Sequence, residues 1–372
     1  MIPINLPLLG EDEVEAVRNV LLSGRLTEWR LEGGPVCREF ERSFASYVGA
    51  KHAIAVSSGT AALHAALMAI GVGPGDEVVV PDFTFVATAN AVLLAGATPV
   101  LVDIDPETYN IDADSVRRAI SERTKAIIAV HLYGLPADLD PIMELAERLG
   151  IYVIEDAAQA HGSEYRGRRV GSLGHIACFS FYSSKVITTG GEGGMITTND
   201  DELAWRLRSI RTHGQREGGD TERLGHNYRL TEMQAAIGMV QLKKLQAFLE
   251  ARRRNAKALT SCLRGVEGVK TPVEPPDRRH NWYLYTIEVE ESVRNRLVDL
   301  LNREGCGAAV YYRTPIHATP LHARLSKKVG SLSAAERASK RVLQLPVHPA
   351  VSLSQVEWIG SLVARFVREL SG

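Results

Sequence analysis

The chain is poor in cysteine and in long apolar runs. Its 4 cysteines in 372 residues are widely spaced and form no CxxC pair: Cys37, Cys178, Cys262 and Cys306. This spacing argues against a zinc site and a disulfide framework, so we expect free thiols in a cytoplasmic protein. No apolar run reaches the ~18 residues that a membrane helix needs. Residues 1–7 are too short and too interrupted by proline for a signal peptide.

An excess of charge of one sign is also missing. The 43 Lys and Arg residues nearly balance the 44 Asp and Glu residues, for a net charge of −1. The chain therefore has no basic field for nucleic acid. The run Arg252-Arg253-Arg254 falls in a helical pattern and indicates a solvated helix face rather than a phosphate site. The histidines lack the HExxH spacing of a metalloprotease site, so no metal site is predicted.

Apolar residues make up 45% of the chain, enough for a large core and two domains. Short runs that are apolar throughout indicate strands buried on both faces, and helical patterns lie between most of them. The runs cover residues 77–81, 99–103, 126–131, 152–156, 176–180 and 194–198. The expected fold class is α/β, with a mostly parallel central sheet covered by helices.

The last third of the chain has a different pattern. Residues 231–263 form one long helical stretch, 281–289 indicate a strand, and 291–304 and 351–370 indicate helices. We therefore predict a large domain over 1–245 and a smaller α+β domain over 246–372.

Lys185 stands between an aromatic strand and a glycine-rich turn, residues 188–194. Ser180 ends this aromatic strand, and Asp156 ends the apolar run 152–156 that precedes it in the chain. Ligands of such sheets gather at the carboxyl ends of the strands. An amine, a carboxylate and hydroxyls in that place are what a pyridoxal 5'-phosphate (PLP) site requires. A solvated loop lysine and a plain strand-ending acid are the alternative interpretations.

Three neighbouring features fit the same cofactor. Residues 56–67 combine a strand end, a Ser-Ser-Gly-Thr turn and an alanine-rich helix, whose first N–H groups form an anion site. Small residues around Gln159 leave room for a flat ring beside Asp156. Phe85 is able to stack on such a ring. Taken alone, the turn before the alanine-rich helix is more typical of an ordinary capped helix, and Phe85 is more typical of core packing.

Taken in order, the segments resemble the DegT/DnrJ/EryC1/StrS family of PLP-dependent sugar aminotransferases. The resemblance covers nearly the whole chain and rests on Ser58-Gly59-Thr60, 73–78, 84–88, 108–112, 131–134, 155–159, 179–185 and Asn227-Tyr228-Arg229. It implies a fold-type-I aminotransferase and a homodimer whose active sites are shared between subunits.

The resemblance also implies roles for individual residues. Lys185 is the expected Schiff-base lysine and proton shuttle, and Asp156 the partner of the ring nitrogen. Gln159 is expected over the ring or its hydroxyl, with Phe85 on the opposite face. The remaining implied contacts are to the phosphate (Gly59, Thr60, Ser180, and Asn227 from the partner chain), to the donor carboxylate (Arg229) and to the sugar nucleotide (Tyr312, His317).

Two positions depart from the family pattern. One extra glycine stands in Gly190-Gly191-Glu192, and Tyr311 occupies a position where many relatives have histidine. Some relatives are dehydratases with histidine in place of the lysine, so Lys185 favours amino transfer.

The resulting hypothesis is transfer of an amino group from an amino acid, with glutamate as the expected donor, to a keto-sugar nucleotide. A PLP-binding regulator without turnover, and a dehydratase or cyclitol aminotransferase on the same fold, are the alternatives.

Overall fold

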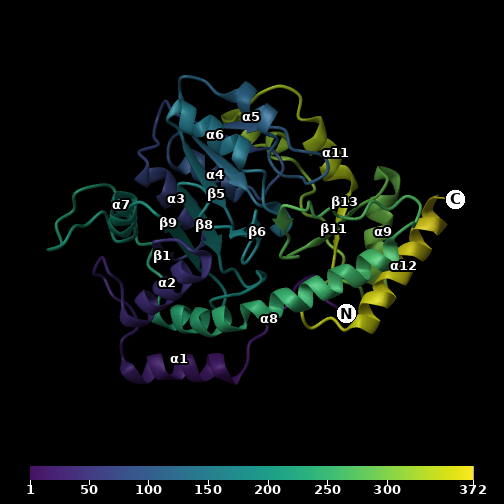
Figure 1. Cartoon of the computed structure of the whole chain (residues 1–372), viewed down its shortest axis with the longest axis horizontal. Helices are drawn as coiled ribbons and strands as arrows, with labels where there is room; N and C mark the ends of the chain where they lie inside the picture. Colours follow the sequence, from purple (N-terminus) through teal and green to yellow (C-terminus); the bar gives the residue numbers. More distant parts are fainter. Residues whose placement is uncertain (372) are drawn as a thin grey trace.

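The computed structural model describes residues 1–371 and is built around one eight-stranded sheet (Figure 1). The strand order is β1-β9-β8-β5-β4-β2-β3-β12. The strands are β1 (His52–Val56), β2 (Glu77–Pro81), β3 (Thr98–Val102), β4 (Thr124–Val130), β5 (Tyr152–Asp156), β8 (Ile176–Ser180), β9 (Gly194–Thr198) and β12 (Lys327–Lys328). Only β9 runs antiparallel to its neighbours, β1 and β8. The predicted α/β class with a mostly parallel sheet is therefore confirmed.

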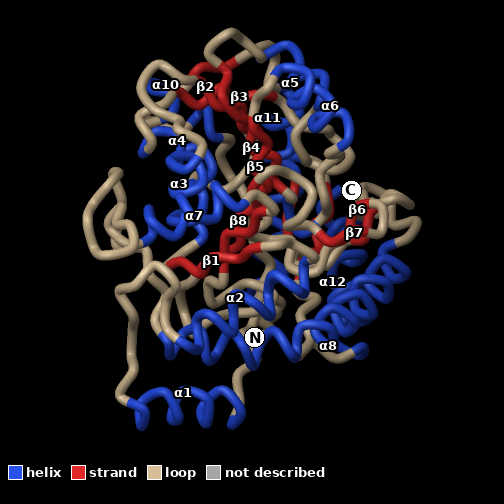
Figure 2. The backbone as a smooth tube through the Cα atoms, turned by 60° about the vertical axis from the view of Figure 1, so that its left-hand side comes forward, coloured by secondary structure: helices blue, strands red, loops and turns tan. Residues whose placement is uncertain are grey.

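Helices cover both faces of this sheet, which runs as a twisted band through the middle of the molecule (Figure 2). One face packs against α3 (Gly59–Ala69), α4 (Ala87–Leu94) and α7 (Asp201–Arg211). The other packs against α5 (Ala113–Ala119), α6 (Asp140–Leu149), α2 (Pro35–Val48) and the start of α8 (Glu232–Leu263). Successive strand residues point to opposite faces, so strands covered on both sides must be apolar throughout. This burial explains the uninterrupted apolar runs.

The chain after α8 builds a second, smaller core. The strands β11 (Tyr285–Glu288) and β13 (Val342–Leu345) pair antiparallel and pack with α9 (Glu291–Arg303), α12 (Leu353–Ser371) and the end of α8. The other elements are α1 (Glu11–Ser23), α10 (His322–Leu325), α11 (Ser333–Arg341), the 3₁₀ turns Leu132–Gly134 and Ile316–Ala318, and the short strands β6 (Glu164–Tyr165), β7 (Arg168–Arg169) and β10 (Arg278–Arg279). No helix within residues 1–371 is long and apolar enough to cross a bilayer.

The predicted boundary at residue 245 falls inside the continuous helix α8, which runs along both parts of the molecule (Figure 1). Two segments also cross between the parts: Ile2 bridges Cys306, and β12 pairs with β3. The division at 245 stays a prediction.

Two expectations from the sequence were wrong in detail. The predicted strand over 281–289 begins only at Tyr285, because Trp282 has a left-handed φ of 57° that no strand accommodates. Arg252 does not lie on a solvated face, since α8 passes between the two cores there and leaves Arg252 only 1% exposed.

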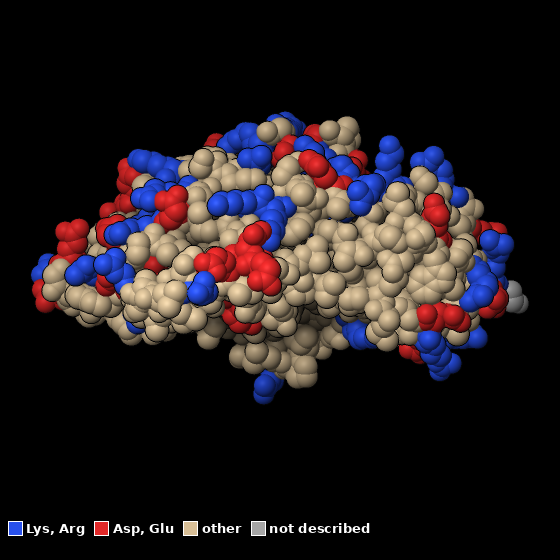
Figure 3. All heavy atoms as spheres, turned by 90° about the horizontal axis from the view of Figure 1, so that it is seen from below, with Lys and Arg blue, Asp and Glu red and all other residues tan. Residues whose placement is uncertain are grey.

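Charged side chains of both signs are interspersed on the face shown in Figure 3. Neither sign gathers into one field on this face. The view agrees with the near-zero net charge of the chain.

Candidate cofactor and active site

A cavity of about 630 Å³ lies at the carboxyl ends of β4, β5 and β8 and the start of α3. It is lined by eight of the eleven predicted site residues: Gly59, Thr60, Phe85, Asp156, Gln159, Ser180, Lys185 and Tyr312. The structure thus brings together most of the residues that the sequence singled out.

Asp156 ends β5 and is only 6% exposed. Thr88 Oγ1 donates to its Oδ2 over 2.8 Å, and the backbone N–H of Ala158 donates to its Oδ1 over 3.2 Å. Burial raises the pKa of Asp156, while these hydrogen bonds and the charge of Lys185 act in the opposite direction. A buried carboxylate held in this way needs a cationic partner, which a protonated pyridine ring would supply.

Lys185 is held in a turn, where its N–H donates to the carbonyl of Tyr182 over 2.9 Å. The glycine-rich segment packs directly beneath, with a bridge between Tyr182 and Gly191. Gly190 has a φ of 88°, and a Cβ on it would lie 2.6 Å from Ile237 Cδ1. The glycine that departs from the family pattern is therefore required by its own backbone conformation, and its packing against α8 adds a second constraint.

An anion cradle forms where α3 begins at the cavity wall. Ser58 caps α3 by accepting from the N–H of Ala61 over 3.0 Å. The first N–H groups of the helix, on Gly59 and Thr60, have no partner within it. A Cβ on Gly59 would lie 2.8 Å from the Cβ of Ser180, so only glycine lets the strand and the helix come this close. This arrangement suits a phosphate group.

Other parts of the cavity wall suit a flat ring. Phe85 is 55% exposed although it is a large aromatic residue, and its ring centroid lies 6.0 Å from that of Tyr312. The amide of Gln159 is fixed, since it accepts from the N–H of Tyr133 over 2.7 Å and donates to the Tyr312 hydroxyl over 3.1 Å. The donor set of amine, carboxylate and anion cradle, with an uncovered aromatic face, fits PLP.

Three predicted residues do not line this cavity. Asn227 is exposed and bridges Thr212. Arg229 bridges Val56, and burial together with the charge of Arg211 lowers its pKa. The roles predicted for these two residues stay predictions.

His317 is the third residue outside the cavity. Its Nδ1 lies 2.6 Å from Asp82 Oδ2, and its Nε2 lies 3.4 Å from Glu336. It therefore anchors the loop that carries Tyr311 and Tyr312, and its predicted contact with the sugar nucleotide stays a prediction.

Sequence reasoning missed several residues of the cavity and its supports. Thr88 lies in one of the recognised motifs, four residues after Thr84, and this spacing could have suggested that the two hydroxyls lie close together, as they do over 3.3 Å. Tyr182 and Tyr283 also line the cavity. Tyr283 gave no signal, because it belongs to an irregular segment that the sequence indicated as a strand.

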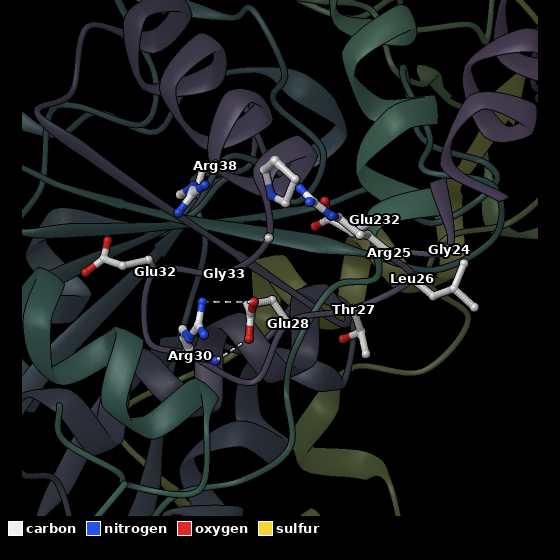
Figure 4. A pocket seen from close by; sticks show the side chains of 12 residues that line it. Gly24, Arg25, Leu26, Thr27, Glu28, Arg30, Glu32, Gly33, Arg38 and Glu232 are labelled. Carbon is white, nitrogen blue, oxygen red and sulfur yellow. Dashed lines mark hydrogen bonds and ion pairs between the residues drawn. The ribbon is translucent and has the colours of Figure 1, made fainter. Parts of the chain in front are cut away.

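A second hollow of about 680 Å³ lies between residues 24–34 and the start of α2 (Figure 4). Its charged lining is balanced, with Arg25, Arg30 and Arg38 against Glu28, Glu32 and Glu232. Glu232 already accepts from the N–H groups of Val36 and Cys37, over 2.8 and 3.3 Å, and so caps α2. The Glu232 carboxylate is therefore already engaged within the chain.

Comparison with known proteins places the chain among aminotransferases. The model of the DegT/DnrJ/EryC1/StrS aminotransferase family matches residues 7–364. The chain is 45% identical to the pleiotropic regulatory protein of Geobacillus stearothermophilus, over 91% of each chain. It is 43% identical to GDP-perosamine synthase of Caulobacter vibrioides, over 91% of this chain and 92% of that one.

A solved structure agrees with this placement. The structure of DesV from S. venezuelae, in complex with a ketimine intermediate, superposes with a TM-score of 0.91 at 39% identity, over 98% of this chain and 99% of DesV. The fold, the grouping of Lys185 and Asp156 and these matches agree. The chain belongs to the DegT/DnrJ/EryC1/StrS aminotransferase family, and it is a PLP-dependent aminotransferase of fold type I.

Proposed function

We propose that the protein transfers an amino group from an amino acid, with glutamate as the donor, to a keto-sugar carried on a nucleotide. The product is an amino-deoxy sugar nucleotide. The observation that carries this proposal is the single cavity that joins Lys185, Asp156 and the anion cradle of Gly59 and Thr60. The similarity to a GDP-perosamine synthase supports a nucleotide sugar as the acceptor.

Individual residues of the cavity have separate roles in this reaction. PLP, when bound, supplies an electron sink for the carbon that loses its proton. Lys185 holds the cofactor through its amine and, once released, takes up the proton lost by the donor's Cα. The Asp156 carboxylate would accept a hydrogen bond from the ring N–H and keep that nitrogen charged. Gly59, Thr60 and Ser180 would hold the phosphate.

The cavity wall is rich in phenol groups, from Tyr182, Tyr283, Tyr311 and Tyr312. Phenol hydroxyls donate and accept hydrogen bonds and their rings pack on apolar faces, so this wall suits a sugar.

We further propose a cytoplasmic homodimer with shared sites. Asn227 is exposed and does not line its own subunit's cavity, which supports its predicted contact with the phosphate in the partner subunit. Free cysteines in this chain support the location.

The test is a panel of keto-sugar nucleotides supplied with glutamate and the PLP-loaded protein. Release of 2-oxoglutarate together with an aminated sugar nucleotide is the expected result. Protein that binds PLP but releases no 2-oxoglutarate with any acceptor would overturn the proposed reaction. Parallel reactions with other amino acids identify the donor.

A second candidate is a PLP-binding regulator without turnover, favoured by the 45% identity to a pleiotropic regulatory protein. Addition of glutamate alone separates the two. A transaminase converts its bound cofactor and its absorption spectrum changes, whereas a regulator without turnover keeps the same spectrum. Product analysis likewise separates amino transfer to a sugar from dehydration or from amination of a cyclitol.

A further inference from the structure

Tyr283 lies against the side chain of Lys185. Its ring centroid is 5.0 Å from Lys185 Nζ, and its hydroxyl is 3.3 Å from Ser184 Oγ. Tyr283 lines the cavity but is only 7% exposed, so the ring is held in one place rather than free to swing. The distance lies within the range at which a ring face attracts a cation.

The backbone next to Tyr283 is held in a strained conformation. The preceding residue, Trp282, has a φ of 57°, a conformation that a bulky side chain rarely adopts. The N–H of Tyr283 donates to Asn281 Oδ1 over 2.8 Å, and the N–H of Leu284 donates to the carbonyl of Tyr133 over 3.2 Å. Strained backbone held by such bonds is typical of functional sites.

Arg252 also holds the segment that carries Tyr283, and its burial costs free energy. Its guanidinium is buried and donates to the carbonyls of Trp282 and Tyr283, each over 3.2 Å, and to Asn5 Oδ1. Within residues 1–371 it has no carboxylate partner, and burial lowers its pKa to about 10. A buried cation without an ion pair is expensive, so its contribution is to hold the segment that presents Tyr283.

The same segment is joined to the loop that follows Asp156. Asn281 Nδ2 donates to the carbonyls of Gln159 and His161, over 2.8 and 3.1 Å. The segment that carries Tyr283 and the loop that follows Asp156 are therefore held in one hydrogen-bonded frame.

We propose that the ring face of Tyr283 is a docking site for the Lys185 side chain whenever its amine is not covalently engaged. The face attracts the ammonium form, so it holds the proton-carrying Nζ at one place in the cavity wall. Tyr283 is thus a positioning residue for the proton transfer. This inference rests on the proposed function, because only a lysine that is released and re-engaged during turnover needs such a site.

The test uses the full chain after removal of PLP. An amine-reactive acylating reagent modifies only the neutral form of Lys185, and peptide mass spectrometry follows the extent of reaction against pH. In Tyr283→Leu, loss of the ring face should move the midpoint of this curve down by about 0.4 to 0.7 pH unit. Tyr283→Phe keeps the face and should keep the wild-type midpoint.

Two controls separate docking from simple opening of the cavity. A more open cavity raises the plateau rate of acylation and, by hydrating the ammonium form, would move the midpoint up, opposite to the shift expected for lost docking. Tyr311→Leu, which removes another ring from the same wall, should leave the midpoint in place. An unchanged midpoint in Tyr283→Leu, or an equal shift in Tyr283→Phe or Tyr311→Leu, would overturn the proposal.

Tyr283→Met serves as a second variant if the leucine variant does not fold. A protein that fails to transaminate any sugar would refute the proposed function but would leave this midpoint measurable. The two failures are therefore distinguishable.

Discussion

At the scale of single residues, the first prediction is that turnover depends on the amine of Lys185. Lys185→Ala removes both the covalent link to PLP and the group that moves the proton, so turnover should fall at least about a thousandfold. The measurement is the rate of 2-oxoglutarate formation from glutamate. Borohydride should trap PLP on residue 185 of the wild-type protein and not on that of the variant. Near-normal turnover in Lys185→Ala would remove this residue from the mechanism.

The charge of Asp156 gives the second prediction. Asp156→Asn keeps the shape but loses the negative charge that faces the ring nitrogen, and kcat should fall about tenfold to a hundredfold, the value of one charged hydrogen bond. Thr88→Val should cause a smaller loss, because it removes only the 2.8 Å hydrogen bond to Oδ2.

Thr88→Ser restores the hydroxyl and is the matched control for Thr88→Val. Equal activity of the valine and serine variants would show that the Thr88 hydroxyl does not support Asp156.

Site residues with a distinctive functional group could be located from the sequence. Lys185 and Asp156 follow buried strands, and the strand ends of a parallel sheet meet at one edge, so their approach could be predicted. Tyr283 could not, since only the left-handed Trp282 and the buried Arg252 bring its ring to the lysine. Both features depend on contacts between distant parts of the chain.

At the scale of elements, the glycine-rich turn after Lys185 yields the third prediction. Gly190→Ala forces a side chain onto a φ of 88°, which should cost about 1 to 3 kcal/mol of stability. The neighbouring Ile237 Cδ1 ends a flexible side chain that is able to move, so the backbone contributes most of this cost. Thermal unfolding and retention of PLP during dialysis measure the effect.

Gly73→Ala is the control for this variant. A methyl group on Gly73 would meet no atom within 4 Å, and this glycine has no left-handed φ, so its substitution should leave both measurements unchanged. A Gly190→Ala protein as stable as Gly73→Ala would show that the turn tolerates a side chain.

Strands and helices with strong patterns were predictable to within about two residues. Runs such as 152–156 and 176–180 are apolar because helices cover them on both faces. The segment 281–284 was not predictable in the same way. Its residues favour a strand, but hydrogen bonds to Arg252 and Tyr133 hold it in an irregular path.

At the scale of the whole molecule, the sequence pattern predicted the long helix α8 accurately but not the packing around it. The 231–263 pattern predicted the helix, but it did not show that Arg252 passes between two cores. Periodicity describes one face of a helix, whereas burial by two separate cores requires knowledge of the packing. The prediction of a solvated helix face failed for Arg252 for this reason, whereas Arg254 is exposed as predicted.

Acid sensitivity is the last prediction and concerns the stability of the molecule as a whole. His161 and His280 are buried, and desolvation lowers the pKa of each to about 3. Both are neutral in the folded protein, while in the unfolded chain each takes up a proton below a pH of about 6.5. Their contribution to stability is therefore complete above that pH and is lost as the pH falls toward 3.

The free energy of unfolding should fall by about 1.4 kcal/mol per pH unit for each histidine in this window. His161→Phe isolates one of them, because the ring of His161 already packs against Phe179 and Phe181. Denaturant unfolding at fixed protein concentration between pH 4 and 6 measures this dependence. In the His161→Phe variant, the free energy of unfolding should fall with decreasing pH less steeply than in the wild type, by that amount. His213→Asn, at an exposed position, should keep the wild-type slope. Equal slopes in all three proteins would mean that His161 becomes protonated without unfolding, and that its burial is less complete in solution.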